Sequence, residues 1–345
     1  MNRQWIHTLT GLLLWAFALP LAAYVLLRLT LRDGYWLLAF ANNFSPYYFI
    51  PLVIALPLAL LLRHRRVSVV LTALTVVAGA WYGPRFVPRT PPVLADNAQT
   101  TLTVVSFNVY GNNAELDKAV GWLLATDADV ILLQETAEPI IQDAYATLTD
   151  AYPYRVLPHL WGDAMLSRYP VENITTYDLE GDGIESHAKV DIVVDGQTIA
   201  LYNVHLFLPL GPVERFPLPI DNPFTQMFAS YDETQRNAQI DALLARVAEE
   251  TNPYIVAGDF NMSDNAIKYN DVAHVMVDSY REAGIGFGHT WPVVGTWGLP
   301  QAIPTALRID YIFHSGDFVT RDIYRGENLG SDHLPLVATL TLVSR

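Results

Sequence analysis

The chain of 345 residues contains no cysteine, three lysines and, among its first 89 residues, one acidic side chain, Asp33. Without cysteine there is no disulfide framework and no thiolate nucleophile or ligand. With so few lysines, the chain lacks the clustered ammonium groups that help general nucleases hold duplex phosphates. The scarcity of acid in the first 89 residues sets them apart from the rest of the chain.

Charge divides the chain into two parts. The first 89 residues hold eight arginines, whereas 34 of the 35 acidic and 13 of the 21 basic residues follow them. The later part therefore has a net charge of −21, from 13 positive and 34 negative side chains. Hydrophobic residues make up 51% of the chain and the mean hydropathy is +0.21, both high for a soluble enzyme. We expect an apolar N-terminal region followed by an acidic soluble domain.

Three apolar runs predict about three transmembrane helices within residues 1–83. Residues 9–29 contain one charge, Arg28, and at about 1.5 Å per residue they can cross a hydrocarbon core of roughly 30 Å. Residues 35–62 carry no charge but several prolines, which predicts an interfacial stretch followed by a kinked span. Residues 67–82 form a shorter third run. A cleaved signal peptide is the alternative for the first run, and the two later runs argue against it.

The basic cluster at residues 63–66 predicts the orientation in the membrane. Basic loops stay on the cytoplasmic side, so three spans place the soluble domain outside the cytoplasm, on an integral protein of the plasma membrane. A re-entrant second run would reverse this orientation. Residues 84–100 contain four prolines and predict a semi-rigid linker. The soluble domain is then residues 101–345.

In the soluble domain, short apolar runs of strand character end in, or contain, polar side chains. Helical periodicity lies between some of them, at residues 114–124 and 233–247, and β-branched residues dominate the runs. This pattern predicts an α/β sandwich with functional groups at strand ends. Four apolar runs, 102–107, 130–133, 199–204 and 254–257, are followed by such residues; run 309–313 contains one, and run 334–342 is preceded by two. In chain order, these residues are Asn108, Glu135, His205, Asp259, Asn261, Asp310, Asp332 and His333.

Taken singly, these residues have ordinary structural explanations. Glu135 alone could cap a helix, Asn108 could form a turn, and His205 could be a surface histidine. Together at strand ends, their carboxylates would repel one another unless a cation neutralised them. Hard oxygen ligands that leave room for substrate phosphate favour Mg²⁺, with Mn²⁺ as a substitute, over Zn²⁺.

Six ordered segments carry a family resemblance: TLTVVSFNV, DVILLQET, LYNVHL, VAGDFN, LRIDYIF and GSDHLP. They resemble the endonuclease/exonuclease/phosphatase (deoxyribonuclease I-like) superfamily over about residues 100–345. The resemblance implies a four-layer sandwich, with two packed β-sheets flanked by helices, and phosphoesterase activity. WGDAMLSRYPV is similar to another strand of the family, but Asp163 stands where the family more often has a small residue or an amide.

The resemblance also implies roles for individual residues. Glu135 matches the family's metal-binding glutamate, with Asn108 and Asp332 supporting the metal. Asp259 matches the residue that orients or deprotonates the attacking water, and Asn261 matches a donor to phosphate oxygen. His333 matches a histidine that is paired with an aspartate, here Asp310. His205 matches a second histidine that contacts phosphate.

Two features narrow the expected substrate. The charge of −21 disfavours nucleic acid, and residues 207–228, rich in Phe, Leu and Pro, predict either a packed surface loop or a lip that dips into a membrane. Apolar runs ahead of this domain also resemble the membrane-bound VanJ-type branch. We therefore expect hydrolysis of a lipid-linked phosphate, pyrophosphate or phosphodiester at the outer membrane surface. The alternatives are an extracytoplasmic nuclease or nucleotide phosphodiesterase, and an inactive membrane scaffold.

Overall fold

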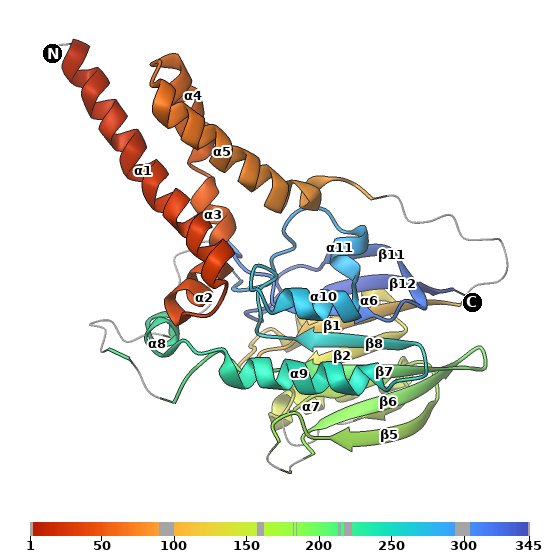
Figure 1. Ribbon diagram of the computed structural model, residues 1–345. Coiled ribbons are helices and arrows are strands. Elements are labelled where there is room, and N and C mark those ends of the chain that lie inside the picture. The colour runs from red at the N-terminus through yellow and green to blue at the C-terminus, as the bar shows by residue number, and fades with distance from the viewer. Residues whose placement is uncertain are drawn as a thin grey trace. The chain divides into compact units, whose positions relative to one another are not determined.

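The computed structural model describes residues 3–89, 100–156, 162–181, 183, 185–212, 215–216, 223–293 and 304–343. It comprises two compact units (Figure 1). The first contains Met1–Val87 together with Asn265–Ile267, and the second contains Pro88–Asp264 and Lys268–Arg345. Each unit has its own core and is described separately.

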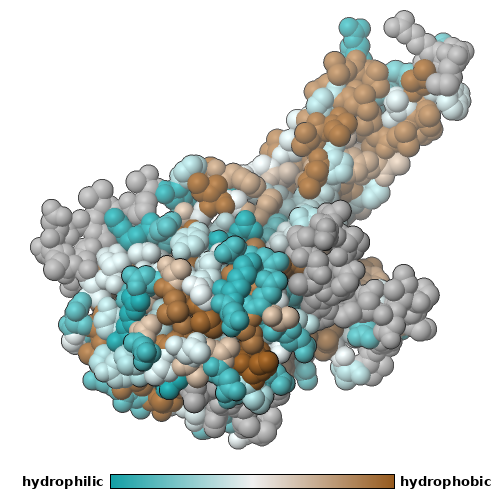
Figure 2. Space-filling view, turned by 180° about the vertical axis from the view of Figure 1, so that it is seen from behind, coloured by the Kyte–Doolittle hydropathy of each residue, from teal (hydrophilic) through white to brown (hydrophobic). Residues whose placement is uncertain are grey.

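The first unit is built from helices. They are α1 (Arg3–Leu31), α2 (Trp36–Asn43), α3 (Ser45–Phe49), α4 (Leu52–Leu61), α5 (Arg65–Tyr82) and the 3₁₀ turn η1 (Gly83–Phe86). Within the described residues, two helices are long and apolar enough to cross a membrane, Gln4–Leu31 and Arg65–Phe86. Apolar side chains gather on the outside of the helices of this unit (Figure 2), and those exposed include Leu12 and Leu13 on α1 and Val53, Ile54 and Leu61 on α4.

The second apolar run is broken, as its prolines predict. Trp36–Asn43 and Ser45–Leu61 meet at a bend of 75°, so the described residues offer up to three candidate spans, by length and composition, if this pair counts as one. Pro46 lies in the first turn of α3 and Pro51 immediately precedes α4. Because proline lacks a backbone N–H, it can begin a helix but weakens one that continues through it.

A buried polar network joins three helices of the first unit. Arg28 on α1 donates from Nη1 to the Tyr24 hydroxyl at 3.1 Å and to Ser45 Oγ at 3.2 Å. The Tyr82 hydroxyl on α5 donates to the same Ser45 Oγ at 2.9 Å. In a low-dielectric environment an arginine needs such partners, so this network accounts for the one charge in the first apolar run.

The second unit contains two six-stranded sheets (Figure 1). The first has the order β11-β12-β1-β2-β4-β3, and the second has the order β5-β6-β7-β8-β10-β9. The strands of the first sheet are β1 (Thr101–Asn108), β2 (Val130–Gln134), β3 (Tyr154–Val156), β4 (Ala164–Ser167), β11 (Phe318–Arg325) and β12 (Leu336–Leu342). Those of the second are β5 (Val171–Tyr177), β6 (His187–Val194), β7 (Gln197–His205), β8 (Tyr254–Asp259), β9 (Val277–Asp278) and β10 (Asp310–His314).

Alternating side chains of the strands form two apolar layers. One layer fills the space between the sheets and includes Val104, Leu132, Ile192, Leu201 and Ile255, all of them buried. The opposite faces of β1 and β2 pack against helices α6 (Leu116–Thr126) and α7 (Pro139–Ala146), followed by the turn η2 (Thr147–Asp150). The predicted four-layer sandwich is therefore confirmed.

The remaining helices accompany the second sheet or connect its strands. They are α8 (Pro223–Ser230), α9 (Thr234–Ala248), α10 (Tyr269–Val275) and α11 (Ser279–Ala283). α9 connects the parallel strands β7 and β8, and in Figure 1 it runs along the direction of β8. The predicted helices at 114–124 and 233–247 correspond to α6 and α9, and the predicted final strand at 334–342 corresponds to β12. The differences of one or two residues lie at element ends, where assignment is least sharp.

Gly258 allows two site-bearing strands to approach closely. In the parallel pair of β7 and β8, Val204 lies opposite Gly258 and His205 lies opposite Asp259. A Cβ atom added to Gly258 would lie 1.8 Å from the carbonyl oxygen of Val204, and the φ angle there is +144°. A side chain at this position would therefore separate the strands that carry His205 and Asp259.

We expect Gly258→Ala to lower the thermal midpoint of the full-length protein substantially. Backbone strain of this kind costs on the order of 1–3 kcal/mol before any steric clash is added. Gly121→Ala on α6 is the matched control, because no atom lies within 4 Å of its added Cβ and alanine favours helix. Thermal unfolding in detergent compares the two. Equal midpoints for both variants would contradict the role assigned to Gly258.

Candidate active site

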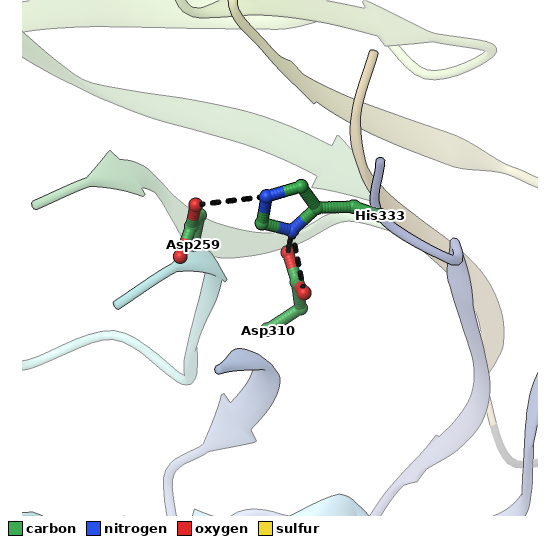
Figure 3. A group of neighbouring side chains, drawn as sticks. All are labelled: Asp259, Asp310 and His333. Carbon is green, nitrogen blue, oxygen red and sulfur yellow. Dashed lines mark hydrogen bonds and ion pairs between the residues drawn. The ribbon is translucent and has the colours of Figure 1, made fainter. Parts of the chain in front are cut away.

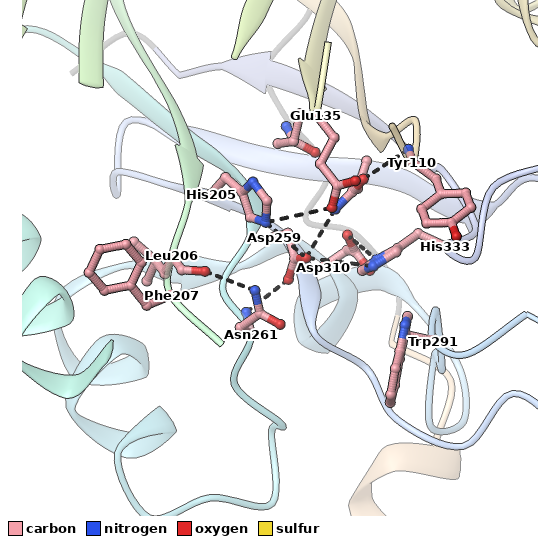
Figure 4. A network of polar contacts seen from close by, with 12 residues as sticks. Tyr110, Glu135, His205, Leu206, Phe207, Asp259, Asn261, Trp291, Asp310 and His333 are labelled. Carbon is pink, nitrogen blue, oxygen red and sulfur yellow. Dashed lines mark hydrogen bonds and ion pairs between the residues drawn. The ribbon is translucent and has the colours of Figure 1, made fainter. Parts of the chain in front are cut away.

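The strand register brings the predicted residues to one edge of the sandwich. The parallel strands β1 and β2 carry Asn108 and Glu135 at their carboxyl ends. The parallel strands β7 and β8 end at His205 and Asp259. β10 is antiparallel to β8 and begins at Asp310, which lies opposite Asp259. The side chains converge in space (Figure 4).

Glu135 is held by two hydrogen bonds at the end of β2. Asn108 Nδ2 donates to Glu135 Oε1 at 3.0 Å, and the backbone N–H of Gly111 donates to Oε2 at 3.0 Å. Burial raises the pKa of Glu135, but these hydrogen bonds outweigh burial and hold the pKa below its ordinary value. The side chain remains 32% exposed, so a charged carboxylate faces the opening of the site.

Asp259 occupies the centre of the cluster and is buried. Its Oδ1 accepts from the backbone N–H of Asn261 at 2.8 Å, and its Oδ2 accepts from Asn108 Nδ2 at 3.2 Å. His205 Nε2 and His333 Nε2 lie 3.8 Å and 3.6 Å from Oδ2. Burial raises the pKa of Asp259 to about 8, despite the opposing effect of His333.

His333 forms a buried pair with Asp310 (Figure 3). Its Nδ1 lies 2.9 Å from Asp310 Oδ2 and 3.1 Å from Oδ1. Burial lowers the pKa of His333, but the carboxylates of Asp310 and Asp259 outweigh burial and raise that pKa to about 10. The imidazole is therefore cationic near neutral pH, with Nε2 directed toward Asp259.

His205 and Asn261 complete the side of the site formed by β7 and β8. His205 Nε2 lies 3.9 Å from Glu135 Oε1, and its side chain is 23% exposed. Asn261 has a positive φ of 46° and donates from Nδ2 to the carbonyl of Leu206 at 2.8 Å. The left-handed backbone places this amide beside the end of β7, and asparagine tolerates that conformation better than most residues.

Asp332 immediately precedes His333 in the chain and is also buried. Its Oδ1 is 4.0 Å from His333 Nε2, and its Oδ2 accepts from Trp291 Nε1 at 3.3 Å. Ser331 Oγ donates to the carbonyl of Asn108 at 2.7 Å, which ties this segment to the end of β1. All eight predicted residues are thus joined by contacts of 4.0 Å or less.

The described residues offer one group of three acidic or histidine side chains with ligand atoms within 4.8 Å of one another, and it is Asp259, Asp310 and His333. This differs from the predicted metal ligands Asn108, Glu135 and Asp332. A protonated His333 that is paired with Asp310 is a poor metal ligand. Glu135 is charged and faces the opening of the site, so we retain it as the leading candidate for a metal ligand.

Sequence reasoning missed two buried arginines that fix the loops around the site. Arg236 on α9 donates from Nη1 to the carbonyl of Asn261 at 2.8 Å. Arg308, two residues before Asp310, makes a bidentate contact with Asp278 at 2.9 and 2.7 Å. A bidentate arginine holds its partner in a defined orientation. The segment LRIDYIF contained this signal, because an arginine stood inside an apolar run.

The segment of residues 207–228 lies only partly within the described residues. Leu218 and the side chain of Phe224 fall outside them. Leu208 is 46% exposed, and the ring of Phe216 lies 5.6 Å from that of Phe228. The backbone of Gly211 donates to the carbonyl of Ser230 at 2.6 Å. The two ends of the segment are therefore tied together beside His205.

We expect Asp310→Asn to lower the pKa of His333, because burial then acts with less opposing charge. NMR spectra of protein with isotope-labelled histidine, recorded across pH 5–11, give this pKa. The signal that is missing from the spectrum of His333→Ala identifies His333. Glu282→Gln is the matched control, since Glu282 lies 3.0 Å from a different histidine, His314. An unchanged His333 pKa in Asp310→Asn would contradict the pairing.

Comparison with solved structures shows the same fold. An endonuclease/exonuclease/phosphatase from Bacteroides vulgatus matches with a TM-score of 0.55 and 19% identity, covering 70% of this chain and 99% of that one. TDP2 from Caenorhabditis elegans matches with a TM-score of 0.54 and 16% identity, covering 70% and 75%. A Leptotrichia buccalis protein described by the same family name matches at 0.51 and 18%, covering 69% and 99%.

Comparison of sequences identifies the family. No curated protein sequence matches the chain. The profile of the Endonuclease/Exonuclease/phosphatase family, however, matches residues 105–333, which span all eight residues of the site. The chain therefore belongs to the endonuclease/exonuclease/phosphatase family.

Proposed function

We propose that the chain is a membrane-anchored, divalent-metal-dependent phosphoesterase that hydrolyses a lipid-linked phosphate ester, pyrophosphate or phosphodiester at a membrane surface. Members of its family are hydrolases that act on phosphate esters. The observation that carries the proposal is the convergence of four carboxylates, two imidazoles and two amides from both sheets at one edge of the sandwich. An inactive scaffold would have no need to preserve this arrangement.

Electrostatics of the site support a bound divalent cation. Even with both imidazoles protonated and with Asp259 neutral, as its raised pKa implies near pH 7, the carboxylates of Glu135, Asp310 and Asp332 leave a net charge of −1. All of these carboxylates except Glu135 are buried, and most of the nearby donor atoms are hard oxygens, as Mg²⁺ or Mn²⁺ requires. Glu135, supported by Asn108 and Asp332, would hold the ion. When bound, such an ion supplies Lewis-acid stabilisation of charge on a phosphoryl group.

The remaining side chains are suited to in-line attack by water. Asp259 has a pKa raised to about 8 by burial, so its ionised form is a stronger base than an ordinary carboxylate and can take a proton from water. His333 is cationic and can stabilise negative charge that develops on phosphate oxygens. His205 is partly exposed and can contact the phosphate as it enters. Asn261 supplies an amide next to both.

Three properties of the chain support a lipid-borne substrate. The part that follows residue 89 carries a net charge of −21, which opposes polyanions such as nucleic acid. Apolar helices on the same chain would hold the enzyme where lipid substrates are found. Leu208, close to His205 in the chain, exposes an apolar side chain. Together with the VanJ-type resemblance and the basic residues 63–66, these properties favour an active site outside the cytoplasm.

We expect Glu135→Gln to reduce turnover of a soluble phosphodiester, bis(p-nitrophenyl) phosphate, on the order of 100-fold or more, because the substitution removes a ligand charge worth several kcal/mol. EDTA should have the same effect, and Mg²⁺ or Mn²⁺ should reverse it. Glu138→Gln, an exposed glutamate three residues later, is the control. Undiminished hydrolysis in excess chelator would exclude the metal-dependent mechanism.

Leu208→Ser should reduce hydrolysis of a bilayer-embedded phosphodiester about tenfold and leave the soluble substrate unaffected. A fully buried leucine contributes roughly 1.5–3 kcal/mol on leaving water, and a tenfold change corresponds to about 1.4 kcal/mol. Leu124→Ser is the matched control, with 45% exposure against 46%. Leu124 lies near the end of α6, just before β2 begins, and so at the edge opposite Glu135. Equal losses on both substrates would indicate a structural role for Leu208.

A further inference from the structure

A cavity of about 120 Å³ lies between the two sheets beside the candidate active site. Its walls include Leu132, Met165, Val190 and Leu201, which belong to the apolar layer between the sheets. A water molecule needs roughly 10–15 Å³ of such space, so the cavity has room for a small organic group.

The cavity lies at the same edge of the sandwich as the site. Asn203 lines it and precedes His205 by two residues on β7, so the two side chains lie on the same face of that strand. Ala164, also in the lining, lies opposite Leu133 near the end of β2. The carbonyl of Gly162 accepts from the backbone N–H of Thr136 at 2.7 Å, which joins this wall to Glu135.

Asp163 is the unusual member of the lining. Both of its carboxylate oxygens are buried, and neither has a hydrogen-bond partner among the residues that the structure describes. Burial raises the pKa of Asp163 to about 7, and the nearby charge of His205 opposes that effect. A buried carboxylate without a hydrogen-bond partner is unfavourable in its charged form, and a positively charged occupant would stabilise that form.

The other polar groups in the lining already have partners. Asn203 Nδ2 donates to the carbonyls of Leu133 and Ala164, both at 2.9 Å, and its Oδ1 accepts from Gln134 Nε2 at 2.6 Å. Ser186 Oγ donates to Glu180 at 2.9 Å. Thr176 Oγ1 donates to the Glu185 carboxylate. Among the described residues of the lining, Asp163 is therefore the one whose buried polar atoms have no hydrogen-bond partner.

We propose that this cavity binds an organic ammonium group of the substrate, and that Asp163 pairs with its charge. A primary ammonium has three N–H donors to satisfy, whereas the described lining offers one carboxylate without a partner, three polar side chains that already hydrogen-bond elsewhere, and otherwise aliphatic walls. A methylated ammonium carries the same charge, makes no demand for hydrogen bonds and packs its methyl groups against leucine, valine and methionine. The cavity therefore favours a methylated ammonium.

This inference rests on the proposed function, because it places the ammonium group at the far end of a phosphate ester bound near His205. It refines the substrate to a phosphoester whose head group carries a methylated amine. It also assigns a role to Asp163.

Binding to the full-length protein in detergent tests the assignment. Three ligands are titrated by calorimetry: phosphocholine, its uncharged isostere 3,3-dimethylbutyl phosphate, and phosphoethanolamine. We expect the wild type to bind phosphocholine at least about tenfold more tightly than the other two. Asp163→Asn should reduce this preference to less than about twofold. Asp143→Asn, which removes the same charge from an exposed position on α7, should leave the preference unchanged.

Tetramethylammonium chloride tests the cavity without any phosphate. It should raise the thermal midpoint of the wild type relative to equal NaCl, and this shift should be absent in Asp163→Asn and in the cavity-filling variant Ala188→Leu. A wild type with no preference for phosphocholine and no response to tetramethylammonium would overturn the inference. If the phosphate ligands bind but show no preference for an ammonium group, this inference fails and the proposed function stands. If none of the phosphate ligands binds but tetramethylammonium still raises the thermal midpoint, the proposed phosphoesterase function fails and the ammonium site stands.

Discussion

Crowding of negative charge at one edge of a β-sandwich is the constraint on which the rest of this structure depends. Asp259 and Asp310 lie opposite each other in adjacent strands, and Glu135 and Asp332 complete the group. Such a group is unstable by itself, because buried like charges raise one another's pKa values. His333 relieves part of the repulsion, and the remaining charge gives the site its affinity for a cation and, through that cation, for a phosphate.

Maintaining this arrangement requires supports outside the site. Gly258 lets β7 and β8 approach so that His205 and Asp259 are neighbours. Arg236 holds the carbonyl of Asn261, and Arg308 fixes Asp278 while its guanidinium lies 4.6 Å from the centre of the Tyr311 ring. These residues contact no reacting group, yet they determine where the carboxylates point. The cost of gathering like charges is offset by rigid packing around them.

The sequence predicted the site residues wherever polar side chains stood at the ends of apolar runs. Asn108 and Glu135 stand at the ends of neighbouring parallel strands of one sheet, and His205 and Asp259 end neighbouring parallel strands of the other, so each pair could be predicted from strand ends. Arg236 could not be predicted to be buried, since an arginine on an amphipathic helix ordinarily faces solvent. Trp291 also gave no signal, because its contact with Asp332 joins residues far apart in the chain. The role proposed for Asp163 depends on the shape of a cavity, which the periodicity of the sequence does not encode.

The central claim is that the carboxylate cluster binds a divalent cation. Titration of Mn²⁺ into the full-length protein, followed by the loss of the free-ion electron paramagnetic resonance signal, measures this binding without any substrate. We expect saturable binding of Mn²⁺, and we expect Mg²⁺ to displace it. The affinity for Mn²⁺ should be at least about tenfold lower in Asp332→Asn. Absence of saturable binding, or binding that Asp332→Asn leaves unchanged, would contradict it.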